Sequence, residues 1–370
     1  MSFITAPLTI AAIAAVLAAL IAVVDKIVNN YGDCEIDINN GTKKLTVKGG
    51  EPLLGLLASE GIFLPSACGG RGSCGACKCQ ITSDVGQHLP TETPYLTDEE
   101  IAERIHLSCQ IKVKADLAIN IPDDLFNVKQ FKAKVLSIKD LTYDIKEVLF
   151  DLGDEDIKFK AGMYIQIVVP PYKKVKGGTQ RAYSMSSRPL DDHKVEVLIR
   201  LVPGGIATTY VHEQLKEGDT MDLVGPFGDF RRSETDATMV CVAGGSGMAP
   251  FKSILHEMID SNITQRDLWY FFGARSLKDM FYMDEMRALE KANPWFHFIP
   301  ALSEPQEEDN WKGDVGLITD VLDRYIKDKI GVETEMEGYL CGSPGMINAC
   351  NNVMTGNGIA LENIYYDKFA

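Results

Sequence analysis

The first feature of the hydrophobic pattern is an apolar run over residues 4–24, which holds 21 residues without a charge. An α-helix of that length spans ~30 Å, the thickness of a hydrocarbon core. Asp25 and Lys26 end the run. We therefore expect a transmembrane anchor over residues 1–28, with Lys26 as a weak signal for the cytoplasmic side. The alternatives are a buried core helix and a cleaved signal peptide, although no positive residue precedes the run and it exceeds a usual signal core.

Apolar and polar residues alternate after this run, which is typical of short strands. Residues 34–39 and 43–48 flank Asn39-Asn40-Gly41 and predict a β-hairpin. Residues 52–62 predict a short helix that ends near Gly61, and 106–113 and 117–122 predict later strands. With a boundary at 122–127, the pattern indicates a small α+β domain over residues 32–125.

Closely spaced strands recur in the next part of the chain, with turn residues between them. They are expected over residues 132–141, 145–152, 163–169, 194–202 and 220–228. Such a series of short strands favours a small antiparallel β-barrel. This second domain is expected over residues 128–232.

The order of the elements changes after Arg232, where strands begin to alternate with helices. Strands are expected over residues 239–245, 267–275, 295–303 and 337–343. Helices are expected over residues 251–260, 284–292, 316–326 and 345–354. This alternation predicts a doubly wound α/β domain with a parallel sheet over residues 235–370.

Composition narrows the function classes. The chain is 45% hydrophobic and 24% charged, so it can form globular cores. Its net charge of −15 argues against nucleic-acid binding, which needs cations to neutralise phosphates. Nine cysteines in a long chain do not fit a small secreted disulfide scaffold. Several of these cysteines are crowded together, which points to a metal.

The cysteine pattern is the most specific signal in the sequence. Cys68, Cys74 and Cys77 share one glycine-rich loop, and Cys109 follows at a distance. Two irons bridged by two sulfides need four thiolates, and glycines let backbone N–H groups approach the sulfurs. A zinc site is the alternative, but four-cysteine zinc sites usually use two separated C-x2-C pairs. The pattern therefore favours a 2Fe–2S cluster.

The other cysteines receive no metal role. Cys79 lies two residues beyond Cys77 in an expected strand, on the same face but further from the metals. Cys34 and Cys241 are expected in the core, and Cys350 is assigned no role.

Three further segments have weaker signals for cofactor binding. The motif Arg181-Ala182-Tyr183-Ser184 offers an arginine, an aromatic ring and a hydroxyl that suit a flavin, although such a tyrosine is often plain core. Phosphate-binding turns are suggested in two places by glycines at the start of an expected helix. They comprise Gly204, Gly205, Ile206, Ala207 and Thr208, and then Gly244, Gly245, Ser246, Gly247, Met248 and Pro250.

Two strand ends and the terminus of the sequence add candidates. Arg275 and the pair Cys341-Gly342 follow expected strands, where a doubly wound sheet places its ligands. Arg275 could equally be solvated, and a lone cysteine is more often buried filler. The aromatic Phe369 belongs either to a frayed tail or to a segment that covers a flavin.

Together these motifs resemble known families. CGGRGSCGAC resembles a plant-type ferredoxin loop with one extra residue between its first two cysteines. RAYS, GGSGMAP and CGSPGM resemble the flavin and nicotinamide motifs of the ferredoxin–NADP reductase superfamily, which commonly has CGPP in the last position. Behind an N-terminal anchor, and with GARS, DMFYMDEM and ALSEPQEEDNWKGDVG, they resemble the F subunits of Na⁺-translocating NADH:quinone oxidoreductases over essentially the whole chain.

This resemblance implies a multidomain fold with a transmembrane helix, a β-grasp ferredoxin domain, an antiparallel β-barrel FAD domain and a doubly wound NADH domain. It implies that Arg181, Tyr183 and Ser184 meet the flavin and that residues 204–208 bind its phosphates. Residues 244–250 would bind the nicotinamide pyrophosphate. Cys341 would lie near the reacting nicotinamide carbon, and Phe369 would shield the flavin. The ending YDKFA differs from the family's usual one.

The function implied is transfer of a hydride from NADH to FAD, and of single electrons through the 2Fe–2S cluster to membrane partners and quinone. NADH is favoured over NADPH because no cluster of basic residues suits a 2′-phosphate, apart from Arg275. The expected location is the bacterial cytoplasmic membrane, with one span, partner subunits and the redox domains in the cytoplasm. The alternatives are the soluble NADH-dependent reductase of a multicomponent oxygenase and an electron carrier without catalysis.

Overall fold

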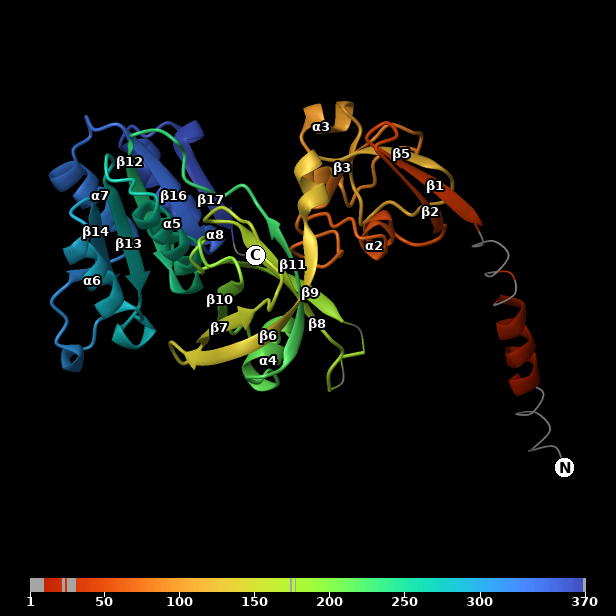
Figure 1. The fold of residues 1–370 in the computed structure, drawn as a ribbon, viewed down its shortest axis with the longest axis horizontal. Helices are drawn as coiled ribbons and strands as arrows, with labels where there is room; N and C mark the ends of the chain where they lie inside the picture. The colour runs from red at the N-terminus through yellow and green to blue at the C-terminus, as the bar shows by residue number, and fades with distance from the viewer. Residues whose placement is uncertain (1–9, 22–23, 25–30, 174, 177, 369–370) are drawn as a thin grey trace. The chain divides into compact units, whose positions relative to one another are not determined.

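The computed structural model describes residues 10–21, 24, 31–173, 175–176 and 178–368, and the chain forms two compact units. The first unit ends at Asn127 and the second begins at Val128. Each unit is drawn in Figure 1, the first in red to orange and the second in yellow to blue. Each is considered by itself below.

The segment expected to anchor the chain is described only in part. Residues 10–21 are helical, and the apolar side chains of Ile10, Leu17 and Ile21 are 68%, 53% and 68% exposed. Residues 1–9, 22–23 and 25–28 of the expected anchor lie outside the described residues. Among the helices that the structure describes, none combines the length and the apolar character needed to cross a membrane.

The first unit contains a five-stranded sheet in the order β2-β1-β5-β3-β4. Its strands are β1 (Asp33–Ile38), β2 (Lys43–Lys48), β3 (Lys78–Ile81), β4 (Ile105–Leu107) and β5 (Leu117–Asn120). The predicted hairpin is confirmed: β1 and β2 pair antiparallel, and Asn39 and Asn40 both have φ of 52° in the turn. Asparagine tolerates this left-handed conformation better than most residues.

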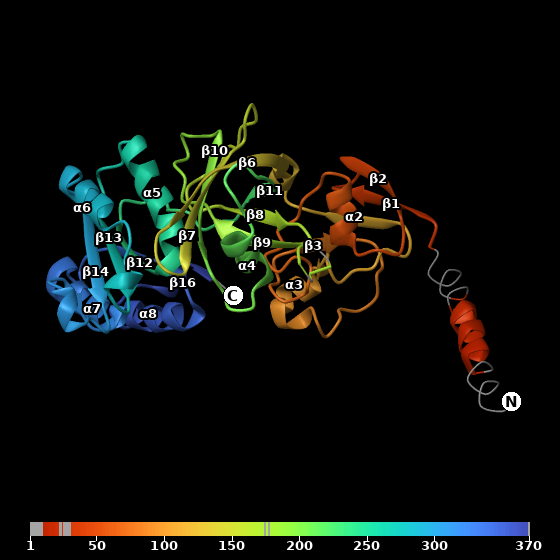
Figure 2. The same cartoon turned by 90° about the horizontal axis from the view of Figure 1, so that it is seen from below.

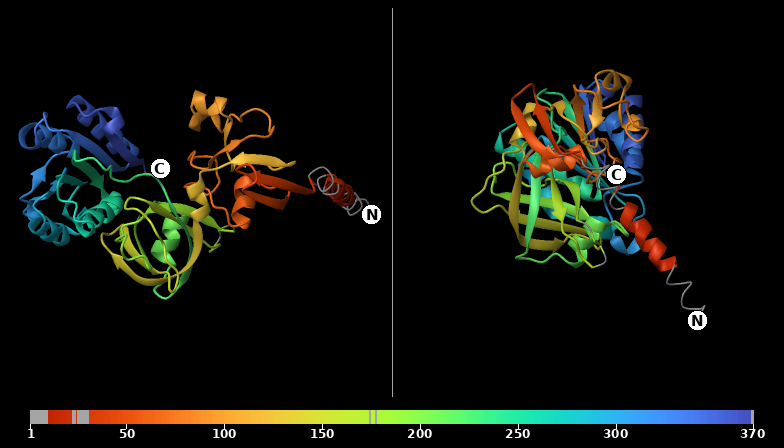
Figure 3. Two further views of the ribbon diagram at one scale, coloured as in Figure 1. Left: turned by 45° about the horizontal axis from the view of Figure 1, so that its top comes forward. Right: turned by 90° about the vertical axis from the view of Figure 1, so that its right-hand side faces the viewer.

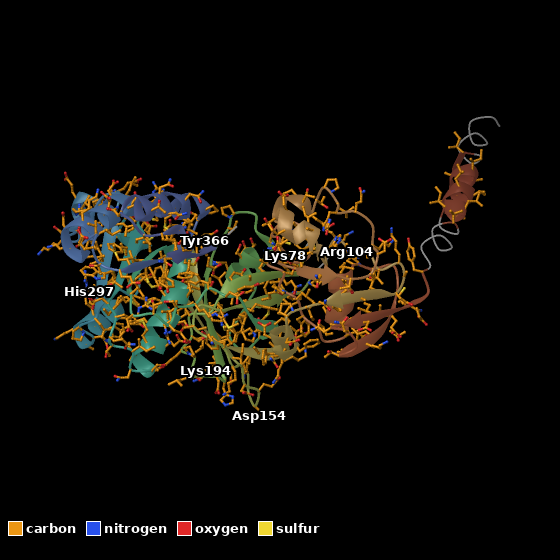
Figure 4. The ribbon with its side chains drawn as sticks, turned by 90° about the horizontal axis from the view of Figure 1, so that it is seen from above. Lys78, Arg104, Asp154, Lys194, His297 and Tyr366 are labelled. Carbon is orange, nitrogen blue, oxygen red and sulfur yellow. The ribbon has the colours of Figure 1, made fainter. Side chains whose placement is uncertain are left out.

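Helix α2 (Leu53–Ser59) is also confirmed and packs Leu53, Leu54 and Leu57 into the core of the first unit. Helix α3 (Asp98–Ala102) begins with a capping box between Thr97 and Glu100. Short 3₁₀ turns span Thr93–Tyr95 and Asp123–Asn127. Figure 4 labels Lys78 on β3 and Arg104 just before β4.

The second unit begins with the expected antiparallel strands. They are β6 (Lys129–Asp140), β7 (Ile145–Asp151), β8 (Tyr164–Val169), β9 (Thr179–Ser184), β10 (Lys194–Arg200) and β11 (Thr220–Phe227). The sheet order is β10-β7-β6-β11-β8-β9, and a bridge from Met185 to Val197 joins its two edges. The sheet therefore curls into a barrel beside α4 (Ile206–Glu213), as Figure 3 shows.

The rest of the second unit is the expected parallel sheet, in the order β15-β14-β13-β12-β16-β17. Its strands are β12 (Thr238–Gly244), β13 (Leu268–Ala274), β14 (Phe296–Leu302), β15 (Asp314–Val315), β16 (Met336–Gly342) and β17 (Ile364–Lys368). Every pair in it is parallel, which agrees with the doubly wound prediction.

Helices cover both faces of this sheet. They are α5 (Met248–Asp260), α6 (Met283–Ala292), α7 (Ile318–Tyr325) and α8 (Pro344–Gly356). Figure 2 shows α5 and α6 on one face and α7 and α8 on the other. Two apolar cores result: Phe251 and Met286 belong to one, and Val321 and Met354 belong to the other. Short 3₁₀ turns span Gly245–Gly247, Leu277–Asp279, Glu307–Asp309 and Leu361–Asn363, and a π-helical turn spans Ile326–Ile330.

Candidate cofactor sites

The cysteine loop lies between α2 and β3 of the first unit. Cys68, Cys77 and Cys109 are buried and Cys74 is partly exposed. The loop turns through glycines with positive φ, among them Gly75 at 70°. A Cβ on Gly75 would lie 2.8 Å from the Cβ of Tyr95, so a larger residue would displace the loop. The sequence therefore needs glycine here for both conformation and space.

The four predicted ligands lie as two pairs of neighbouring thiols. Cys74 donates a side-chain hydrogen bond to Cys68, and Cys77 donates one to Cys109. The bond from Cys77 lowers the pKa of Cys109 to about 6, against the opposing effect of burial. Burial also acts against ionisation of Cys68, but hydrogen bonds from Ser73, Cys74 and Arg71 outweigh it and lower the pKa to about 7. In each pair, the thiol that accepts the hydrogen bond has the lower pKa and ionises more readily than its partner.

This donor set fits a 2Fe–2S cluster better than zinc. Two pairs of thiols match two irons that each take two protein ligands. A zinc ion instead needs four ligands around one point. The backbone N–H of Arg71 also donates to Cys68 Sγ at 3.2 Å, as expected for a ligand whose hydrogen bonds tune the metal.

The bystander cysteines behave as ordinary core residues. Cys79 is 2% exposed, and burial raises its pKa to about 12, which disfavours a thiolate. Cys34, Cys241 and Cys350 are also buried. The burial of Cys34 and Cys241 confirms that both lie in the core, as expected.

A buried polar cluster, which the sequence did not indicate, supports the strand that leads to Cys109. Glu92 is 0% exposed and accepts a hydrogen bond from the backbone N–H of Leu107 at 2.8 Å. His106 Nδ1 lies 3.3 Å from Glu92 Oε1, and the His106 ring stacks on His88 with 3.9 Å between centroids. Burial lowers the pKa of His106, against the opposing effect of Glu92.

The predicted flavin motif occupies the last part of β9 in the second unit. Arg181, Ala182 and Tyr183 are partly exposed and Ser184 is buried. The Tyr183 hydroxyl is a buried polar atom without a hydrogen-bond partner among the described residues, and burial raises its pKa. A buried, unpaired hydroxyl is costly unless a ligand satisfies it. The motif therefore fits a bound group with a polar edge.

The second predicted segment forms the start of α4. Gly204 has a φ of 75°, and Gly205 is the N-cap residue without a side-chain cap. Ile206 and Ala207 supply first-turn N–H groups, and Thr208 Oγ1 accepts a hydrogen bond from Val202 N at 3.1 Å. Free N–H groups at a helix start suit the phosphates of a dinucleotide.

The third predicted segment turns from β12 into α5. Gly244 ends β12, Gly245 has a φ of 56°, and Ser246 and Gly247 complete the turn before Met248 and Pro250 enter the helix. A Cβ on Gly247 would lie 2.4 Å from the carbonyl oxygen of Cys341, so the turn packs directly against the end of β16. Two predicted segments distant in sequence are thereby brought together.

The structure adds a carboxylate that sequence reasoning missed. Asp367 lies on β17, in register with Cys341 of β16, and accepts a hydrogen bond from Ser184 Oγ at 2.8 Å. Burial raises the pKa of Asp367 against the effect of this hydrogen bond. Burial also raises the pKa of Cys341, which is 0% exposed. The tail was predicted either to fray or to cover a flavin, and its strand pairing was not anticipated; Phe369 lies outside the described residues.

An open cavity of about 680 Å³ borders Asp367 in the second unit. Its lining includes the aromatic side chains of Tyr164, Phe230 and Tyr365. Figure 4 labels Tyr366, which also lines the cavity, on β17.

Arg275 follows β13, as predicted, and forms an ion pair with Glu304, which follows β14. The distance from Arg275 Nη2 to Glu304 Oε2 is 2.9 Å, and both side chains are largely exposed. Arg275 is therefore neutralised by a carboxylate that the sequence analysis did not single out.

Comparisons with known families match the three domains in order. Residues 36–114 match the 2Fe-2S iron-sulfur cluster binding domain. Residues 132–231 match the oxidoreductase FAD-binding domain, and residues 241–352 match the oxidoreductase NAD-binding domain. The three cofactor types expected from the sequence are those of the matched domains.

Curated relatives are similar over nearly the full length. The F subunit of the Na(+)-translocating NADH-quinone reductase of Idiomarina loihiensis is 37% identical, with 96% of each chain covered. Its namesake from Klebsiella pneumoniae is 36% identical, again with 96% of each chain covered. That of Pseudomonas aeruginosa is 37% identical, with 95% of each chain covered.

Solved structures of two reductases share the fold. A cytochrome P450 reductase from Amycolatopsis is 28% identical with a TM-score of 0.72, and the match covers 91% of this chain and 98% of that one. A ferredoxin reductase of carbazole 1,9a-dioxygenase is 26% identical with a TM-score of 0.68, and the match covers 92% of this chain and 99% of that one.

Proposed function

The chain belongs to the family of Na(+)-translocating NADH-quinone reductase F subunits, and we propose that it oxidises NADH and delivers the electrons to partners in a membrane complex. Bound FAD would accept the two electrons of a hydride and release them singly to the 2Fe–2S cluster. The observation that carries the proposal is the position of Asp367, which accepts a hydrogen bond from Ser184 and lies in register with Cys341. These contacts join the flavin motif to the nucleotide sheet.

Residues of the second unit would bind and orient both dinucleotides. Arg181 and Tyr183 would contact FAD, and the N–H groups at the start of α4 would bind its phosphates. The turn over residues 244–250 would bind the pyrophosphate of NADH, because it leads from a parallel strand into a helix. We also propose that Phe369 shields the flavin.

Ser184 and Cys341 would face the reacting atoms. Ser184 presents its hydroxyl to Asp367, so its orientation is fixed before a cofactor binds. Cys341 is fully buried at the end of β16 and stays a neutral thiol, because burial raises its pKa. A small neutral side chain there leaves room for the nicotinamide ring without adding charge.

Residues of the first unit would hold the 2Fe–2S cluster and pass single electrons onward. Cys68, Cys74, Cys77 and Cys109 would be the ligands, two to each iron. Glu92 would hold the strand that leads to Cys109 in place, because it accepts a hydrogen bond from the backbone N–H of Leu107.

The segment over residues 1–28 would anchor the chain in the bacterial cytoplasmic membrane as a single span, with the redox domains in the cytoplasm. The exposed apolar side chains of residues 10–21 support this, since they have no core of their own to enter. Other subunits of a Na⁺-translocating complex would receive the electrons and reduce quinone.

Two measurements test the proposed function. The purified full-length protein should contain flavin, iron and sulfide, and NADH should bleach the flavin absorbance; a flavin that NADH leaves oxidised would contradict the proposal. A tag on this chain should co-purify membrane subunits.

A second candidate is the reductase of a multicomponent oxygenase, favoured by the similarity to the ferredoxin reductase of carbazole 1,9a-dioxygenase. Fractionation separates the two: recovery wholly in the soluble fraction would support the oxygenase reductase. The membrane complex would be supported if the full-length protein is recovered with membranes and a variant without residues 1–28 is not.

A further inference from the structure

Two carboxylates of the barrel, the buried Glu147 and the partly buried Glu196, contact two side chains of the nucleotide domain within the second unit. Glu147 on β7 is 3% exposed and accepts a hydrogen bond from the Tyr282 hydroxyl. Glu196 on β10 binds Lys252 of α5, with 2.8 Å between Nζ and Oε1. Lys252 Nζ lies 4.4 Å from the centroid of the Tyr282 ring, so the two contacts touch each other. We call these four residues the latch.

Each carboxylate of the latch is also fixed from the barrel side. Lys139 of β6 lies 2.7 Å from Glu147 Oε1. Ser186, just beyond β9, donates to Glu196 Oε1 at 2.7 Å. The acceptors are therefore oriented by the barrel itself, and the nucleotide domain supplies the matching donors.

Tyr282 has a backbone conformation that bulky residues rarely adopt. Its φ is 54° and its ψ is 21°, in the left-handed region, at the residue before α6. Such a conformation persists only where the surroundings stabilise it, and it often marks a functional constraint. Here it places the hydroxyl on Glu147.

The latch lies close in sequence to both proposed cofactor segments. Lys252 is two residues beyond Pro250, on the helix whose first turn would bind the NADH pyrophosphate. Ser186 is two residues beyond Ser184 of the flavin motif and hydrogen-bonds Glu196. The Lys252–Glu196 contact therefore connects the nucleotide turn to the flavin motif through two short stretches of backbone.

A need for stability does not by itself explain why the latch consists of charged and polar side chains. Burying charged groups costs desolvation energy, and apolar side chains of similar size often stabilise such a position equally well. Hydrogen bonds and ion pairs are directional, so they hold the nucleotide turn and the flavin motif in one relative position. Apolar packing would specify that position less precisely.

We propose that the latch positions the NADH-binding turn against the flavin motif for hydride transfer. Its four members are positioning residues, because they act through the segments that bind the cofactors. The inference rests on the proposed function. It predicts that loosening the latch slows hydride transfer while NADH still binds.

The test uses the full-length, flavin-loaded protein and measures flavin bleaching by NADH in a stopped-flow instrument. The concentration dependence gives a limiting rate and an apparent Kd for NADH. The variants are Tyr282→Phe, Lys252→Met and the conservative Lys252→Arg. The matched control is Tyr325→Phe, whose hydroxyl donates to Asp314 at 2.8 Å within the nucleotide domain.

Lys252→Met should lower the limiting rate on the order of tenfold and Tyr282→Phe about threefold, because small misplacements of reacting atoms are costly. The apparent Kd should stay within about twofold, since the turn itself is unchanged. Lys252→Arg should regain most of the rate, and Tyr325→Phe should match the wild-type protein.

The proposal is overturned if Tyr282→Phe and Lys252→Met both bleach at the wild-type limiting rate. It is also overturned if their slower bleaching is explained by an equally large rise in the apparent Kd for NADH or by loss of flavin. Should Lys252→Met fail to fold, the comparison of Tyr282→Phe with Tyr325→Phe decides alone. A wild-type flavin that NADH does not bleach would instead contradict the proposed function.

Discussion

Ser184 on β9 and Asp367 on β17 are joined by a hydrogen bond of 2.8 Å, although 183 positions separate them in the sequence. The contact links the end of the barrel's flavin motif to the last strand of the nucleotide sheet. Ser184→Ala should lower the rate of flavin reduction about 100-fold, because it removes the positioned hydroxyl that we propose lies beside the reacting atoms. Stopped-flow bleaching by NADH measures this, and an unchanged rate with full flavin content would exclude Ser184 from the reaction.

Asp367 should make the protein less stable as the pH rises. Burial raises its pKa in the folded chain, so the folded chain retains a proton that the unfolded chain has lost. Its contribution is complete below the ordinary aspartate pKa of ~3.9 and is lost as the pH rises through the higher folded value. Asp367→Asn should therefore raise Tm at pH 7. Thermal unfolding at several pH values checks this, and an equal gain at every pH would contradict it.

Four cysteines should be required for the cluster and a fifth should not. Cys74→Ala should lose about two irons per chain, because one iron would lack a ligand. Cys79→Ala should keep the cluster and lose only about 1 kcal/mol of core stability. Iron and sulfide analysis with the visible spectrum distinguishes them. Loss of iron from both variants, or from neither, would refute the ligand assignment.

Glu304 should favour NADH over NADPH. Its carboxylate neutralises Arg275 at 2.9 Å and would repel a 2′-phosphate. Glu304→Gln frees the guanidinium, and KM for NADPH should fall on the order of tenfold, because arginine binds phosphate strongly. Glu308→Gln makes the same charge change on an exposed neighbour and serves as the control. Equal KM changes in the two variants would point to net charge rather than the pair.

Because of His106, the first unit should be less stable in mild acid than at neutral pH. Burial lowers its pKa, so the unfolded chain binds a proton that the folded chain excludes. The stability that it contributes is complete above the ordinary histidine pKa of ~6.5 and falls as the pH decreases towards the folded value. The wild-type cluster should be lost faster at pH 5.5 than at pH 7.5, and His106→Gln should reduce that difference. His193→Gln, at an exposed histidine of the barrel, is the control.

The sequence by itself determined the order of the domains and most of the elements. The alternation of strands with helices after Arg232 requires a parallel sheet, and the glycine-rich cysteine loop has few uses other than binding a cluster. Local composition sets these features, because periodicity and turn residues act over a few positions. The four candidate ligand cysteines and the three candidate nucleotide segments could therefore be predicted without coordinates.

Only the tertiary structure decided which distant side chains meet. Nothing near Asp367 in the sequence indicates that β17 extends the sheet beside Cys341, because strand pairing depends on backbone partners far along the chain. Glu304, Glu92 and Tyr282 look like ordinary surface or core residues in the sequence. Their roles depend on Arg275, His106 and Glu147, and the fold alone brings each pair together.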